Sequence, residues 1–310
     1  MSEPALNALA SSMSGLFRKD GTAQGVAKQR LTESLAEPGK RVTYDPFADR
    51  FVKGASVVKC MGHDWTYWLG DKLIPGFHEL LIARTRLIDE FVKEEVAGGA
   101  TQYLILGAGY DTRAFHLGLP ESLTVFEVDQ EAVQELKKAG LPEAAISKPS
   151  VTFVSVDFDK ETLSEQLVKA GFVVGKKTVV TLEGVTQYIT REGAEATLKE
   201  VGALVGPGSS IFISYVDSRL ETDPAAICGK GYVKPETVQI IPRLAAKAAG
   251  EPWISYYAVS DMAALLVSCG FDVVSDRSVD DANTYFRDVG REIPSEKLMM
   301  IERYVVGAKV

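Results

Sequence analysis

Histidine, cysteine and tryptophan are scarce in this chain of 310 residues, which contains three of each. The cysteines, Cys60, Cys228 and Cys269, lie far apart and form no Cys-x-x-Cys pair. This spacing argues against a disulfide framework and against the usual sequence patterns of zinc sites. We therefore expect no bound metal, and a protein of a reducing compartment, the cytoplasm.

Long apolar segments and basic clusters are also missing. The sequence has no run of about 18 apolar residues and no apolar core of a signal peptide at its N-terminus. Its formal net charge is −8 at pH 7, and its lysines and arginines are scattered. Such a chain repels nucleic acid and anionic membranes, which favours a small molecule or a protein as substrate. The oligomeric state stays open.

Short apolar runs rich in Val, Ile and Phe alternate with amphipathic segments from residue 99 onward. This alternation is typical of a doubly wound α/β fold with a parallel sheet. No convincing helix separates the last two strands, so we predict a seven-stranded, mostly parallel sheet with an antiparallel last strand. The expected strands are 103–106, 123–128, 151–156, 178–182, 210–215, 271–274 and a last one near 299–308.

Two regions depart from this pattern. Residues 1–98 look helical and irregular, with the clearest helix at 75–96, and we expect them to form part of an acceptor pocket. Residues 99–310 would form the cofactor-binding domain. Within that domain, residues 219–259 show no strand pattern and contain four of the 13 prolines. A segment of this length is too long for a simple connection, which predicts a lid insertion.

A glycine turn follows the first expected strand. Gly107 and Gly109 lie between that strand and a helix, where small residues let a ligand approach backbone N–H groups at the binding edge of the sheet. Asp129 follows 20 residues after Gly109, at the end of the second strand. A carboxylate there can accept hydrogen bonds from both hydroxyls of a ribose. The combination predicts a cofactor that contains adenosine.

The rest of the turn distinguishes NAD from S-adenosylmethionine. A dinucleotide site has a glycine three positions after the second one, so that the helix N-terminus meets a pyrophosphate. Here Thr112 takes that position, bulky Tyr110 precedes it, and Asp111 places a carboxylate where the diphosphate would lie. Two like charges in contact cost several kcal/mol, on the order of Coulomb estimates. S-adenosyl-L-methionine has no phosphate, and its ammonium group would attract an acid, so we predict this cofactor.

Further ordered motifs extend the pattern over most of the chain: Gly-Val-Ala-Lys-Gln-Arg at 25–30, Asp-Pro-Phe-Ala at 45–48, Ala-Arg-Thr at 83–85, the turn at 106–113, Phe-Glu-Val-Asp at 126–129, Val-Asp-Phe at 156–158 and Leu-Glu-Gly-Val-Thr-Gln-Tyr at 182–188. Together they resemble the motifs of the leucine carboxyl methyltransferase family, in particular its bacterial and fungal small-molecule O-methyltransferases. The resemblance implies a class I Rossmann-like methyltransferase fold with S-adenosyl-L-methionine as methyl donor.

The resemblance also implies which residues contact the cofactor. Arg84 would bind the methionine carboxylate, for which a guanidinium is well suited, and Glu183 would lie near the same end. From the residues alone, Arg84 would instead form a surface ion pair with Asp89 or Glu90. The other implied cofactor residues are Gly107 and Gly109 in the turn, Asp111, Asp129 at the ribose, Asp157 and Phe158 at the adenine, and Lys28 or Arg30 closing over the cofactor.

Few residues are candidates for the acceptor chemistry. A carboxylate acceptor needs alignment and no base, whereas a hydroxyl benefits from one. Tyr188, at the end of a parallel strand, is a candidate for acceptor contact. His63 lies in an aromatic cluster, residues 60–68, and would orient or deprotonate a hydroxyl if that cluster lines the pocket; ordinary packing is the alternative for both. His78 and His116 are expected to be packing or surface residues.

We therefore expect an S-adenosyl-L-methionine-dependent O-methyltransferase that acts on a carboxylate or hydroxyl of a small metabolite. Two alternatives stay open: methylation of a protein C-terminal carboxylate, and a non-catalytic scaffold that binds the cofactor. A short-chain NAD(P) oxidoreductase lacks support, because Tyr103, Tyr188 and Tyr215 have no lysine four positions later.

Overall fold

The computed structural model describes residues 21–148, 150–156, 161–229, 233–250 and 252–310. Within these residues the chain forms two compact units. The described residues of the first unit lie within 21–83, 218–254 and 279–301, and those of the second lie within 84–217, 255–278 and 302–310.

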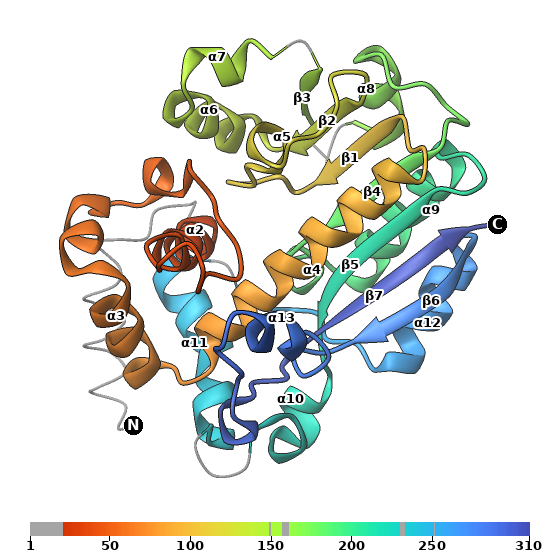
Figure 1. Cartoon of the computed structure of the whole chain (residues 1–310). Coiled ribbons are helices and arrows are strands. Elements are labelled where there is room, and N and C mark those ends of the chain that lie inside the picture. The colour runs from red at the N-terminus through yellow and green to blue at the C-terminus, as the bar shows by residue number, and fades with distance from the viewer. Residues whose placement is uncertain (1–20, 149, 157–160, 230–232, 251) are drawn as a thin grey trace. The chain divides into compact units, whose positions relative to one another are not determined.

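The second unit is built on a seven-stranded sheet (Figure 1). Its order is β3-β2-β1-β4-β5-β7-β6. Strand β7 is antiparallel to both neighbours, and the other neighbours pair in parallel. The prediction of a seven-stranded, mostly parallel sheet with an antiparallel last strand is confirmed. The strands are β1 (Gln102–Leu106), β2 (Thr124–Asp129), β3 (Val151–Ser155), β4 (Thr178–Leu182), β5 (Ser210–Val216), β6 (Phe271–Arg277) and β7 (Glu302–Lys309).

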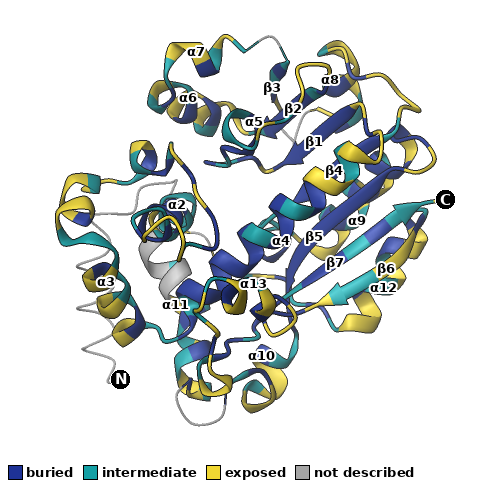
Figure 2. Cartoon of the chain, in the orientation of Figure 1, coloured by how far each residue is buried: buried dark blue, intermediate teal, exposed yellow. Residues whose placement is uncertain are grey.

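Helices cover both faces of this sheet, because its central strands are apolar on both sides. Figure 2 shows β1, β4 and β5 buried along their length. Leu104 of β1 belongs to one core cluster with Leu198 of α9 (Arg191–Leu204) and Leu266 of α12 (Val259–Ser268). Alternate side chains point to the opposite face, where Phe91 of α4 (Phe77–Ala97) lies 5.6 Å from Phe212, measured between ring centroids.

The remaining helices of the second unit are short. Most follow a strand and lead the chain back to the start of the next one, as parallel pairing requires. They are α5 (Arg113–His116), α6 (Glu131–Gly140), α7 (Glu143–Ile146), α8 (Leu163–Lys169) and the 3-10 helix η2 (Thr186–Tyr188).

The first unit is helical in its described part. Residues 219–259, which the sequence assigns to a lid, contain α10, η3, α11 and the first residue of α12. No helix in the described ranges combines the length and the apolar character needed to cross a membrane. The elements of the first unit are α2 (Gly21–Ser34), η1 (Ala48–Phe51), α3 (Ala55–Leu73), the start of α4, α10 (Arg219–Thr222), η3 (Pro224–Ile227), α11 (Pro235–Ala249), α13 (Asn283–Asp288) and η4 (Ser295–Lys297).

Candidate functional site

The glycine turn after β1 adopts a backbone that requires its two glycines. Gly107 and Gly109 have positive φ angles of 66° and 42°, which side chains other than glycine rarely tolerate. A Cβ atom at Gly107 would also lie 2.4 Å from Cγ2 of Val185. The turn is therefore fixed both by its backbone conformation and by the residue packed against it.

Asp129 closes this turn from the end of β2. Its Oδ2 accepts a hydrogen bond of 2.6 Å from the Gly109 N–H, and its Oδ1 accepts one of 2.7 Å from the Gln130 N–H. Burial raises the pKa of Asp129, and these two backbone donors oppose the shift. Each carboxylate oxygen can accept a second hydrogen bond, so the side chain holds the turn and retains acceptor capacity for a ligand.

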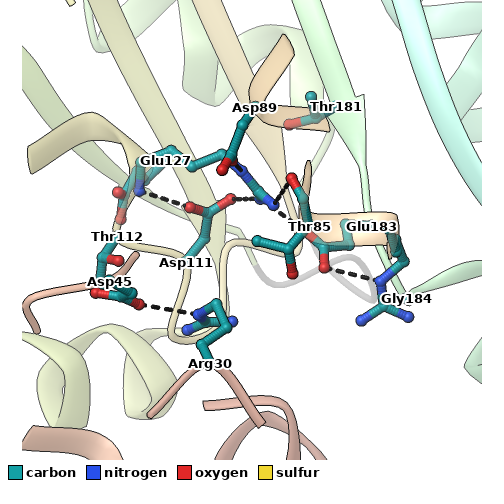
Figure 3. Close-up of polar contacts among 12 residues, drawn as sticks. Arg30, Asp45, Thr85, Asp89, Asp111, Thr112, Glu127, Thr181, Glu183 and Gly184 are labelled. Atoms are coloured by element: carbon teal, nitrogen blue, oxygen red, sulfur yellow. Dashed lines mark hydrogen bonds and ion pairs between the residues drawn. The ribbon is translucent and has the colours of Figure 1, made fainter. Parts of the chain in front are cut away.

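Arg113 binds three carboxylates beyond the turn, those of Asp89, Asp111 and Glu183. Figure 3 labels these three acidic residues. Its Nη1 donates to Asp111 Oδ2 at 2.7 Å and to Glu183 Oε2 at 2.6 Å, and its Nε donates to Asp89 Oδ1 at 2.6 Å. The backbone N–H of Arg113 donates to the other oxygen of Asp111, at 2.8 Å. Both Asp111 oxygens thus bind Arg113, a partner that the sequence analysis did not identify.

Arg84 contributes a second buried guanidinium, on α4. Its Nε donates to Glu183 Oε1 at 2.8 Å, and its Nη1 donates to both oxygens of Glu302, at 2.7 and 2.9 Å. Only 3% of Arg84 is exposed, so the alternative of a surface pair with Asp89 or Glu90 is wrong. Its remaining nitrogen, Nη2, has no hydrogen-bond partner within the part of the chain that the structure describes.

Two arginines and the four carboxylates bonded to them form a connected set, which we call the arginine network. Burial alone would lower the pKa of each arginine, but the surrounding carboxylates raise it instead, so both stay protonated. Burial raises the pKa of the Glu302 carboxyl, against the charge of Arg84. In formal charges, two cations face four carboxylates, which leaves an excess of two negative charges. The members are Arg84, Asp89, Asp111, Arg113, Glu183 and Glu302.

Tyr188 follows β4 on η2, at the carboxyl end of that strand. Its backbone N–H donates to Val185 O at 2.9 Å. Ser255 Oγ donates to Ile189 O at 2.6 Å and fastens the next residue. The half-buried side chain of Tyr188 thus comes from a segment held at the same sheet edge as Glu183.

The basic residues expected to close over the cofactor belong to the first unit. Lys28 is exposed on α2. Arg30 is buried, and its Nε donates to Asp45 Oδ2 at 2.9 Å (Figure 3). The other oxygen of Asp45 accepts the Phe47 N–H at 2.8 Å. Two of the motifs that carry the family resemblance therefore bind each other, which their separation in sequence does not reveal.

His63 lies on α3 of the first unit, directly after a break in the helix at Gly62. Its Nδ1 lies 2.9 Å from Asp64 Oδ1, and its ring stacks on Tyr67 with centroids 5.8 Å apart. The ring of His78 lies 6.5 Å from that of His63. His63 thus contacts an aromatic side chain, as expected, and also lies close to a second histidine.

Glu33 is a buried carboxylate beside His78 that the sequence analysis missed. It accepts hydrogen bonds from Arg291 at 2.7 Å and from the Val42 N–H at 2.6 Å, and its Oε2 lies 3.0 Å from His78 Nε2. Burial alone would raise the pKa of Glu33, but His78 and Arg291 together lower it to about 2. Its partners come from distant parts of the sequence, so no local pattern indicates them.

The predicted site residues divide between the two units. The second unit brings together Gly107, Gly109, Asp111, Asp129 and Glu183 at one edge of the sheet, with Arg84 bonded to Glu183. Lys28, Arg30 and His63 belong to the first unit. Asp157 and Phe158, assigned to the adenine, lie outside the described residues.

Comparisons with known proteins agree with these motifs. A model of the family described as "Leucine carboxyl methyltransferase" matches residues 23–202. A Bacillus subtilis (strain 168) protein named "Putative S-adenosyl-L-methionine-dependent methyltransferase YktD" is 38% identical over 207 residues, 66% of this chain and 65% of the relative. A similarly named protein of Mycobacterium avium (strain 104) is 34% identical over 215 residues, 69% of this chain and 66% of the relative. The chain thus matches slightly less than two thirds of the length of these relatives.

A solved structure shares the fold. The crystal structure of a "putative methyltransferase" from Thermobifida fusca superposes with a TM-score of 0.55 at 17% identity, over 85% of this chain and 92% of that chain. The seven-stranded α/β architecture is therefore one that known proteins adopt with a very different sequence.

Proposed function

Because the chain belongs to the leucine carboxyl methyltransferase family, we propose that it transfers a methyl group from S-adenosyl-L-methionine to a carboxylate or hydroxyl oxygen of a small metabolite. The names of the two relatives support the methyl donor. The acidic composition supports a small acceptor in place of nucleic acid. The three free thiols support a reducing, cytoplasmic location.

The observation that carries this proposal is the excess of carboxylates in the arginine network, directly beyond the glycine turn. Asp111 and Glu183 both belong to it, and their negative charge disfavours a diphosphate at this turn. A methyl donor with a positive sulfonium and an ammonium group is favoured by the same charge. The geometry thus supports the methyl donor over a dinucleotide.

Each residue then has a distinct role in holding the donor. Nη2 of Arg84, which binds no described residue, would donate to the methionine carboxylate. Asp129 would accept hydrogen bonds from the ribose hydroxyls while it keeps its hydrogen bond to the Gly109 N–H. The list is completed by Gly107 packed against the donor, Asp111 and Glu183 near the ammonium, Asp157 and Phe158 at the adenine, and Lys28 or Arg30 closing over it.

The chemical step is an in-line displacement at the methyl carbon. The acceptor oxygen forms the new C–O bond while the C–S bond breaks, and the electron pair of that bond passes to sulfur. The protein aligns the two reactants and excludes water, which supplies roughly 7–11 kcal/mol at best. A carboxylate acceptor needs no base. For a hydroxyl acceptor, Tyr188 or His63 would take or orient the proton.

Titration calorimetry with the product S-adenosylhomocysteine and with NADH tests the donor. We expect binding of S-adenosylhomocysteine and none of NADH. Asp129→Ala should weaken the binding at least about tenfold, since it removes the ribose acceptor. Asp272→Ala is the matched control, because Asp272 is an exposed aspartate on β6 of the same unit. Binding of NADH alone would refute the proposal; unchanged affinity in Asp129→Ala would remove only that residue's role.

A transfer assay with methyl-labelled donor separates the acceptor classes. Label in small metabolites supports the proposal, and label in protein supports methylation of a C-terminal carboxylate. Tight binding of S-adenosylhomocysteine with no transfer to either fraction supports a non-catalytic scaffold.

A further inference from the structure

Three potential metal ligands meet inside the first unit. Glu33 of α2, His63 of α3 and His78 of α4 each offer one ligand atom, and the three atoms lie within 4.8 Å of one another. Glu33 and His78 are buried, and 15% of the His63 side chain is exposed. We call these three residues the histidine cluster.

Both histidines are oriented by a hydrogen bond at Nδ1. His78 Nδ1 lies 2.8 Å from Gln29 Oε1, and His63 Nδ1 lies 2.9 Å from Asp64 Oδ1. With Nδ1–H donating a hydrogen bond to each of these oxygens, the lone pair of the neutral imidazole is on Nε2. Metal-binding histidines usually have this arrangement, with the second ring nitrogen donating to a carboxylate or a carbonyl oxygen.

The inward-facing atoms need a positive charge between them. His78 Nε2 lies 3.0 Å from Glu33 Oε2, so two electron-rich atoms face each other unless a proton or a metal ion lies there. A proton on His78 would satisfy this pair and leave His63 unsatisfied. His63 Nε2 is buried and has no hydrogen-bond partner among the described residues, and a buried unpaired polar atom is costly. One metal ion satisfies all three atoms.

We propose that Glu33, His63 and His78 bind a divalent metal ion of the zinc type through Oε2, Nε2 and Nε2. Two histidines and one glutamate are a known ligand set for zinc with a fourth position open to water. Bonds of about 2.0–2.2 Å place tetrahedral ligands roughly 3.3 Å apart, close to the distance between His78 and Glu33. Closure of the widest pair requires a shift of roughly 1–1.5 Å, within reach of the half-buried His63 side chain.

The other oxygen of Glu33 is already held in place. Its Oε1 accepts hydrogen bonds from Arg291 and from the Val42 N–H, which leaves Oε2 directed at the histidines. Such support fixes the orientation of a metal ligand. The site does not depend on the methyl donor, because none of its residues is assigned to it. With His63 as a metal ligand, the role toward the proton of a hydroxyl acceptor passes to Tyr188.

Zinc titration of the full chain, after dialysis against a chelator, tests this site by calorimetry. We expect one zinc ion per chain. His63→Ala and His78→Ala should each weaken binding at least about 100-fold, because each removes a ligand. His116→Ala is the matched control, since His116 belongs to the second unit, and it should bind zinc as the parent chain does. Far-UV circular dichroism of each variant tests whether it is folded. His63→Ala removes the least buried of the three ligands, so this variant is expected to disturb the fold least.

Cobalt substitution identifies the ligands independently of affinity. We expect the visible absorption of a tetrahedral or five-coordinate cobalt site without a thiolate charge-transfer band, and the same spectrum in Cys60→Ser, which removes the exposed cysteine on α3. No zinc binding by the parent chain, equal affinity in folded His63→Ala, or loss of binding in Cys60→Ser would each overturn the proposal. The first result would mean that a proton on His78 is all that the cluster holds.

Discussion

The two units of this chain bury polar groups in contrasting ways. The arginine network of the second unit joins two guanidinium groups to four carboxylates, and every bond to its arginines is donated by nitrogen. The histidine cluster of the first unit places the ring nitrogens of two histidines close to a buried carboxylate. An arginine cannot accept a hydrogen bond or lose its charge in a protein, whereas a histidine can do both. The first arrangement therefore fixes charges, and the second can receive a cation.

The largest effect is expected from Arg113→Met in the arginine network. Asp89, Asp111 and Glu183 would all lose their contact with this cation, and breaking a buried charge pair costs about 3–5 kcal/mol of unfolding free energy. Urea unfolding measures this loss. Lys199→Met, which removes an exposed pair with Glu195 on α9, is the control and should leave stability unchanged. Equal stability of both variants would show that the network does not fix these charges.

The next largest effect is a pH dependence that arises outside both sets of residues. Glu127 of β2 binds Lys137 at 2.5 Å, and burial raises the pKa of Glu127 from 4.5 to about 7 although Lys137 opposes the shift. Between these pH values the folded state retains a proton that the unfolded state has lost, so the unfolding free energy falls as pH rises. The loss is roughly 3 kcal/mol by pH 8.

The double variant Glu127→Gln/Lys137→Met removes both charged side chains of this pair, including the Glu127 carboxyl, and should flatten that part of the pH profile. Urea unfolding at intervals between pH 5 and 8 compares it with the parent chain. Asp272→Asn, at an exposed position, should keep the parent profile. A double variant with the parent slope would show that another group of the chain causes the pH dependence.

A smaller effect, on ligand affinity, is expected from Arg84→Lys. Lysine keeps the charge but cannot present Nε, Nη1 and Nη2 in one plane, and these bind Glu183, Glu302 and, under the proposed function, the donor carboxylate. Calorimetry should show at least about tenfold weaker binding of S-adenosylhomocysteine. Arg86→Lys, a change at a partly exposed arginine of the same helix, should not alter it. Equal affinities would confine Arg84 to a structural role.

The smallest effect is expected in the first unit, from Arg30→Lys. Arg30 pairs with Asp45 at 2.9 Å, and lysine preserves the charge while it loses the fixed geometry of the guanidinium. We expect a loss of about 1 kcal/mol in unfolding free energy. Arg50→Lys, at an exposed position, should show none. A loss as large as that of Arg113→Met would show that the buried arginine of the first unit contributes as much to stability as that of the second.

The sheet could be predicted from the sequence because buried parallel strands have a local signature. The expected strand at 178–182 coincides with β4, and the one at 103–106 misses only the first residue of β1. The glycine turn was equally visible, since Gly107, Gly109 and the acid at the end of β2 follow each other at short, typical spacings.

The partners of the charged residues could not be predicted in the same way. Arg84 binds Glu302, 218 positions away, and Arg291 binds Glu33 across 258 positions. The local alternative for Arg84, a pair with Asp89 or Glu90, failed because the helix turns that side chain into the protein interior. The proposed metal ligands share this property, since they come from three helices and have no characteristic spacing.

Gly62 has a consequence for how the helix that carries His63 should be drawn. Its φ of 74° and ψ of −179° interrupt α3 seven residues after Ala55, in a conformation essentially confined to glycine. An unbroken helix rotates each residue by about 100° relative to the last, and this break resets that phase. A single helical wheel over all 19 residues of α3 would therefore mix two unrelated faces. Substitutions before and after Gly62 belong on two separate wheels, and any other residue at position 62 would be strained in this conformation.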